Sequence, residues 1–258
     1  MKHAIRTATL LFTATICTTI ATYGQSVTTT ERSPFRRGYM QLGLNLAGNK
    51  LNNSLSPEAN ILKGNHGASA GIVFELGKSY YFLKRTPGQK FNVGLDWTTI
   101  SLSYNSLKKG WGDYARAAGE PDADITAPMI VSLSTKLGPV VSYNPVEQLV
   151  IDLRGQVIAG ISGTTLQYEE SNRGFNAFDK GSNSDEDAGI GDIFKNTFSV
   201  KPGFGITVRR GIVGLSFDYS SYKQSLDYTT SGNNAAAAAG KNAKIPFAFK
   251  QLKLGLYF

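Results

Sequence analysis

Charged side chains that share one face form the largest group of residues able to do chemistry in this sequence. Four carboxylates and five basic groups recur on the polar side of segments whose other side is apolar. They are Glu75, Asp96, Asp152, Asp218, Lys136, Arg154, Lys201, Arg209 and Lys253. In an interior with little water, such groups either pair as a salt-bridge network or line a narrow path for ions. We expect the network, because acids and bases are nearly matched in number.

Catalytic chemistry has little support in the sequence. A hydrolytic or acyl-transfer site needs a nucleophile and a base in register, such as Ser/His or His/Asp. His66 is the only histidine beyond the first few residues, and no second member of such a pair is identifiable from its spacing. We therefore expect His66 to be a loop residue, and we expect neither catalytic residues nor a cofactor.

An acidic stretch, SNSDEDAGIGD, is the one candidate for metal binding. Its carboxylates at Asp185, Asp187 and Asp192 are oxygen ligands of the kind that Ca²⁺ prefers. The spacing is not that of an EF-hand loop, and the Gly/Asp pattern does not repeat. A solvated acidic loop is the expectation, with a weak Ca²⁺ site as the alternative.

The elements that carry these residues alternate between apolar and polar positions with a period of two, which predicts β-strands. Eight such segments follow one another along the chain. They are residues 40–46, 68–76, 91–97, 129–137, 149–161, 198–208, 213–219 and 251–258. No stretch after the first 24 residues is long and apolar enough for a transmembrane helix.

The connections alternate strictly between short and long. The short ones contain RTPGQ, YNPVEQ and RRG, and the long ones are residues 49–66, 105–124, 162–195 and 223–244. Alternation of this kind predicts an eight-stranded antiparallel up-and-down transmembrane β-barrel with short periplasmic turns and long extracellular loops. A lipocalin-like soluble barrel has the same period, but its narrow interior could not hold the large Leu, Phe and Val side chains of all eight apolar faces.

The first 24 residues have the organisation of a secretory signal peptide. Lys2, His3 and Arg6 precede an apolar, threonine-rich run, and small residues lead to an expected cleavage after Gly24. The single cysteine, Cys17, lies inside that run, where Ile16 argues against lipidation. We expect a cleaved signal at 1–24, a periplasmic N-terminal segment at 25–37 and an outer-membrane barrel at 38–258.

The closing segment QLKLGLYF and the features above together resemble the small outer-membrane β-barrel proteins of Gram-negative bacteria, in the versions common among the Bacteroidota. The resemblance implies that the barrel-assembly machinery reads the apolar positions of the last strand, which are Leu252, Leu254, Leu256 and Phe258. Lys250 departs from the pattern and is expected near the outer interface, where a lysine can snorkel. Lys78 also departs, and a bulge near Gly77 would account for it.

Aromatic residues cluster near the expected strand ends, which is typical of membrane-interface girdles. They are Tyr80, Tyr81, Phe82, Tyr143, Tyr257 and Phe258 at the turns, and Tyr104, Tyr219 and Tyr222 towards the loops. Trp111 and Tyr114, in the second long loop, either anchor a partner or pack across the barrel mouth, and we favour packing.

These observations predict a non-enzymatic protein of the outer membrane with a structural, surface-interaction or complex-accessory role. A narrow ion or small-solute pore is the alternative, and a lipid-modifying enzyme is the third. The formal net charge of +8 suits contact with anionic lipid and lipopolysaccharide. The sequence shows no nucleic-acid-binding pattern, and an outer-membrane protein partner would bind through the loops.

Overall fold

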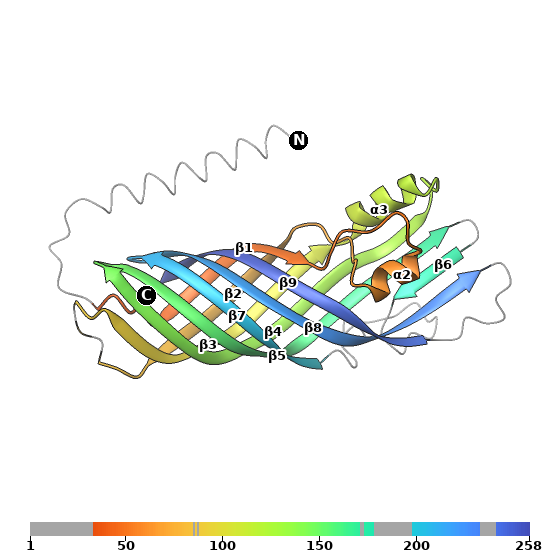
Figure 1. Ribbon diagram of the computed structural model, residues 1–258. Coiled ribbons are helices and arrows are strands. Elements are labelled where there is room, and N and C mark those ends of the chain that lie inside the picture. The colour runs from red at the N-terminus through yellow and green to blue at the C-terminus, as the bar shows by residue number, and fades with distance from the viewer. Residues whose placement is uncertain (1–32, 85, 87, 171–172, 178–197, 233–240) are drawn as a thin grey trace, which may run out of the picture. The chain divides into compact units, whose positions relative to one another are not determined.

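The fold is one antiparallel sheet whose strands pair all the way round into a closed ring. The computed structural model describes residues 33–84, 86, 88–170, 173–177, 198–232 and 241–258 (Figure 1). Eight strands form the ring, namely β1 (Gly38–Ala47), β2 (Gly71–Tyr81), β3 (Phe91–Ser106), β4 (Asp124–Val146), β5 (Leu149–Glu170), β7 (Phe198–Arg210), β8 (Val213–Gly232) and β9 (Lys241–Tyr257). Each pairs with the next, and β9 pairs with β1. The prediction of an all-β antiparallel fold is confirmed.

The two ends of the ring differ, and we name them by their connections. Residues 82–90, 147–148 and 211–212 join strands at the turn end. The loop end carries two helices, α2 (Pro57–Leu62) and α3 (Lys108–Ala117), and a short strand, β6 (Arg173–Ala177) (Figure 1). β6 bridges β5 and β8 beyond the start of β7. Neither helix in the described part of the chain is long and apolar enough to cross a membrane.

Several strands are longer than the sequence pattern predicted. Strands β4, β5 and β8 have 23, 22 and 20 residues, where the sequence pattern marked only residues 129–137, 149–161 and 213–219. The third and fourth predicted loops are therefore strand at 162–170, 173–177, 223–232 and 241–244. The apolar alternation fades there because the extensions bury a second core beneath α2 and α3, including Leu166 and Ile245.

The outer face of the ring is apolar and much of its inner face is polar, which is the reverse of the arrangement in a soluble protein. Alternate side chains on every ring strand are apolar and exposed, among them Leu42, Ile72, Leu102, Leu133, Leu153, Phe204, Leu215 and Leu254. The intervening side chains point inward, and many of them are polar or charged, including the nine predicted charges. A soluble protein of this size does not expose such a continuous apolar surface without a membrane or a partner to cover it.

Two expectations about the outer face need correction. The register irregularity lies opposite Leu76 and Gly77, but the extra residue is Thr99 in β3, where Thr99 and Ile100 are both exposed. Lys78 therefore stays on the outer face, with its Nζ 5.3 Å from the ring centre of Tyr80.

The predicted aromatic girdles are also incomplete. Tyr81, Tyr257 and Tyr222 belong to the inner face, because their positions have the parity of the polar residues. Tyr80, Phe82, Tyr143, Phe258, Tyr104 and Tyr219 are exposed on the outside. Interface aromatics thus remain at both ends, in smaller number than expected.

The seam between the first and last strands is continuous to the final residue. Leu252, Leu254 and Leu256 lie opposite Leu44, Leu42 and Met40 on the outer face. Gly38 and Phe258 exchange both backbone hydrogen bonds, each with an N···O distance of 2.9 Å. Lys250, opposite Leu46, is exposed towards the loop end, in the direction that we expected.

Candidate functional site

The interior of the ring is filled in four layers from the turn end to the loop end. The first layer is a pair of charges closed by an apolar plug, and the second is a cluster of six charges. The third is a small pocket lined by serines, and the fourth is an aromatic core under the helices. The nine charges predicted from the sequence are all buried, and they divide unequally between the first three layers.

The central charge cluster contains three acids and three bases, which are Glu75, Asp96, Asp218, Lys136, Arg154 and Lys253. Lys253 Nζ lies 2.5 Å from both Glu75 Oε2 and Asp218 Oδ2. Lys136 Nζ lies 2.5 Å from Glu75 Oε1 and 3.0 Å from Asp218 Oδ2. The two lysines therefore share the same two carboxylates. Equal numbers of opposite charges make the cluster neutral, which offsets the cost of removing each group from water.

Arg154 joins the remaining carboxylate to this cluster. Its Nη2 lies 2.8 Å from Asp218 Oδ1, and its Nη1 lies 3.8 Å from Asp96 Oδ2. Asp96 also accepts hydrogen bonds from Ser79 and Tyr39, at 2.8 and 3.0 Å. A Cβ added at Gly205 would stand 2.5 Å from Asp218 Oδ1 and 3.0 Å from the Arg154 guanidinium. The cluster thus needs glycine on the wall beside it.

The turn end of the interior holds a separate ion pair. Arg209 Nε donates to Asp152 Oδ2 at 3.0 Å, and Arg209 Nη1 donates to the carbonyl of Pro34 at 2.8 Å. Phe35 is fully buried beside Tyr81, with Val140 and Val150 completing the group. The last residues of the predicted N-terminal segment therefore fold back and plug this end.

Lys201 is the basic residue left over when the other eight charges have paired. It is only 5% exposed, and it makes no ion pair or side-chain hydrogen bond within the described part of the chain. Its Nζ lies 3.8 Å from the ring centre of Tyr222 and 5.0 Å from that of Phe249. Aromatic faces stabilise a cation by about 0.5–2 kcal/mol, which is less than a buried carboxylate supplies.

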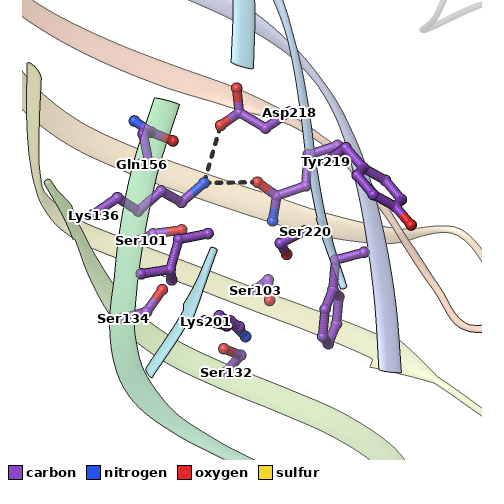
Figure 2. Close-up of a pocket in the computed structure, with 13 residues that line it drawn as sticks. Ser101, Ser103, Ser132, Ser134, Lys136, Gln156, Lys201, Asp218, Tyr219 and Ser220 are labelled. Carbon is purple, nitrogen blue, oxygen red and sulfur yellow. Dashed lines mark hydrogen bonds and ion pairs between the residues drawn. The ribbon is translucent and has the colours of Figure 1, made fainter. Parts of the chain in front are cut away.

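A pocket lies between Lys201 and the central charge cluster. It holds about 390 Å³ of empty space, including the part open to solvent. Its wall carries five serines, which are Ser101, Ser103, Ser132, Ser134 and Ser220. Lys136 Nζ donates to Asp218 Oδ2 and to Gln251 Oε1, and Figure 2 marks no such interaction at Lys201.

The loop end is closed by aromatic side chains rather than by charges. Trp111 is fully buried, and its Nε1 donates to the carbonyl of His66 at 3.0 Å. Tyr114 and Tyr168 pack against Trp111 with ring centres 5.6 and 5.2 Å away. Of the two alternatives for Trp111 and Tyr114, the structure shows packing. The signal in the sequence was the helical spacing of these residues within a predicted loop.

His66 is part of this core and is not an exposed loop residue. Its ring stacks on Phe247 at 4.2 Å between ring centres, and its Nε2 donates to the carbonyl of Pro246 at 3.1 Å. Nδ1 then carries a lone pair, and it has no partner in the described part of the chain. Burial lowers the pKa of His66 to about 4, so the imidazole is neutral near pH 7.

Other predicted site residues lie elsewhere. Leu252, Leu254 and Leu256 are on the outer face of β9, and Phe258, which follows the strand, is also exposed on the outside. The Ca²⁺ candidates Asp185, Asp187 and Asp192 lie outside the described residues. Within the described residues, no group of three or more His, Cys, Asp or Glu side chains is arranged to hold a metal.

Comparison with solved structures gives matches to several chains. The crystal structure of a major outer membrane protein from Thermus thermophilus matches with a TM-score of 0.42 and 9% sequence identity, covering 87% of this chain and 100% of that one. A TM-score below 0.5 does not establish a shared fold. No family model matches the sequence, and no curated protein matches it.

Proposed function

We propose that this protein is an integral outer-membrane β-barrel with a closed lumen and a non-enzymatic role at the cell surface. The observation that carries the proposal is the inverted ring. Apolar side chains cover the outside of eight paired strands, and buried charges fill the inside. Because the ring is closed, the backbone N–H and C=O groups of each ring strand can pair with a neighbouring strand on both sides. Strands can cross lipid only when these groups are paired in this way.

The orientation follows from the two ends. The short connections lie at the turn end, together with Gly38 at the start of the first strand and Phe258 after the last strand. In barrels of this kind, the end with short connections is the periplasmic side. The helices and strand extensions at the loop end would then face the outside of the cell. A partner would bind there, through a surface held in place by the core around Trp111.

Three features argue against the narrow-pore alternative. The Arg209 pair and Phe35 fill the turn end, the central charge cluster fills the middle, and the aromatic core fills the loop end. Eight-stranded barrels have interiors just wide enough for side chains. An ion would have to separate paired charges to pass.

The enzyme alternative is weakened by the surroundings of His66. Its only side-chain hydrogen bond in the described part of the chain is to a backbone carbonyl. A general base needs a nucleophile or a water within reach, and His66 is instead stacked and fully buried. We assign His66 a packing role.

Membrane insertion tests the proposal. The purified protein, refolded into lipid vesicles, is run on a denaturing gel with and without boiling. A closed barrel resists the detergent, so the unboiled sample should migrate faster than the boiled one. Purification as a monomer that stays soluble without detergent would contradict the proposal, because the exposed apolar face would then have no lipid to contact.

Deletion of Phe258 tests the proposed assembly signal in cells. We expect the deletion to lower the amount of protein in the outer membrane, while the refolded variant keeps its gel shift. Normal insertion of the shortened chain would remove Phe258 as a signal without affecting the barrel proposal.

A further inference from the structure

Among the described residues, the interior holds one more basic group than acidic groups, and Lys201 is the base that contacts no carboxylate. Four acids and five bases are buried there, and every acid already contacts at least one base. Asp218 alone contacts three bases, and Glu75 contacts two. No carboxylate in the described residues is left for Lys201.

The pocket beside Lys201 also offers hydrogen-bond donors without protein acceptors. Ser103, Ser132 and Ser220 are buried, and within the described residues their hydroxyl groups make no side-chain hydrogen bond. A hydroxyl donates one hydrogen bond, so a serine that lines the pocket can donate to a group held there. Lys201 adds three more N–H donors.

We propose that this pocket binds one small inorganic anion of halide size, held by Lys201 and by the serine hydroxyl groups. A monovalent anion would pair with the ammonium form of Lys201 and so hold the proton on that side chain, which an uncharged water molecule does less well. Asp218 also lines the pocket, but its carboxylate already contacts three bases of the central charge cluster, so its negative charge is balanced there. The aromatic rings of Tyr222 and Phe249 also lie beside the Lys201 ammonium group.

Size selects the class of anion. Much of the 390 Å³ is space open to solvent, and the enclosed part has room for only one or two water molecules. A chloride-like ion replaces one or two water molecules, whereas gluconate and other organic anions are much larger. The inference does not depend on membrane insertion, because the pocket lies inside the ring in any environment.

Bromide provides the direct test, because its anomalous scattering identifies it in a crystal. Crystals of the refolded protein grown with sodium bromide should show an anomalous peak within hydrogen-bonding distance of Lys201 Nζ. Crystals of Lys201→Met should lack that peak, while the central charge cluster stays in place. A wild-type pocket that holds only water, or an equal peak in Lys201→Met, would overturn the proposal.

A measurement in solution covers the case in which the variant does not crystallise. The thermal midpoint of the wild-type protein should rise by roughly 2–5 °C when chloride replaces gluconate at constant ionic strength. Lys201→Met and Lys201→Gln, checked for folding by the gel shift, should show no such difference. A chloride effect of equal size in both variants would place the anion elsewhere and contradict the proposal. The gel shift itself reports on the barrel, so failure of the anion site and failure of the proposed function are distinguishable.

Discussion

The central charge cluster and the Lys201 pocket lie next to each other in the same interior, yet they handle buried charge in opposite ways. In the cluster, each lysine contacts two carboxylates, and the sum of the charges is zero. In the pocket, a lysine that is also buried makes no ion pair within the described residues, and its Nζ lies over two aromatic rings. A lysine that only fills the barrel is surrounded by carboxylates. A lysine that is available to bind a ligand lacks a carboxylate partner.

Removing a lysine from the cluster should have the largest effect. Lys136→Met leaves Glu75 and Asp218 with fewer partners in a buried setting. We expect a loss of about 3–5 kcal/mol in the free energy of unfolding. Urea unfolding in lipid vesicles, followed by the fluorescence of Trp97 and Trp111, measures it. The exposed ion pair between Asp113 and Arg116 is the control, and Asp113→Asn should change little. Equal effects at the two sites would contradict the role of the cluster.

Acid should act on the loop end of the interior through His66. Its pKa is about 4 in the folded protein and about 6.5 when unfolded, so the unfolded chain binds the proton more tightly between these values. The contribution of neutral His66 to the free energy of unfolding is complete above about pH 6.5 and is lost as the pH falls towards 4. It amounts to about 3 kcal/mol at most. Unfolding measured from pH 7 to 4 should show this slope, and His66→Gln should remove it. An unchanged slope in the variant would assign the effect to other groups.

The barrel wall beside the central charge cluster should tolerate an added side chain less well than the wall elsewhere. Gly205→Ala places a methyl group against Asp218 and Arg154, and we expect a loss of about 1–3 kcal/mol. Gly155→Ala, on the outer face, meets nothing closer than 4.0 Å and is the matched control. Urea unfolding of both variants gives the comparison. A well-tolerated Gly205→Ala would mean that the cluster has room to move.

The smallest effect should come from the unpaired lysine. In a buffer whose anions are too large for the pocket, Lys201→Met removes a buried charge that has no carboxylate. We expect a change of less than about 1 kcal/mol, or a gain in stability. The contrast with Lys136→Met, measured under identical conditions, sharpens the comparison between the two regions. A loss as large as that of Lys136→Met would show that Lys201 has a strong partner.

The sequence contained the inward-facing charges but not their arrangement. Parity places Glu75, Asp218 and Lys253 on one face because side chains alternate along a strand. It does not say which of them meet, because the contacts cross the interior between strands far apart in the chain, as between Lys253 and Glu75. The isolation of Lys201 depends on those contacts and was equally hidden.

The strand extensions at the loop end were missed for a different reason. In residues 162–170 the inward side chains include Leu166 and Tyr168, and the outward ones no longer form an apolar face. A pattern that relies on apolar positions facing outward therefore ends too early. The paired positions of β5 with β4 and β6 show that the strand itself continues.

Conductance across a planar lipid bilayer tests the central claim, a membrane barrel with a closed lumen, most directly. The purified wild-type protein, shown by its gel shift to be folded, is added to the bilayer and the current is recorded across a range of voltages. The account predicts no stable conductance steps, because the Arg209 pair, the central charge cluster and the aromatic core fill the interior. Reproducible single-channel steps from the folded wild-type protein would contradict it.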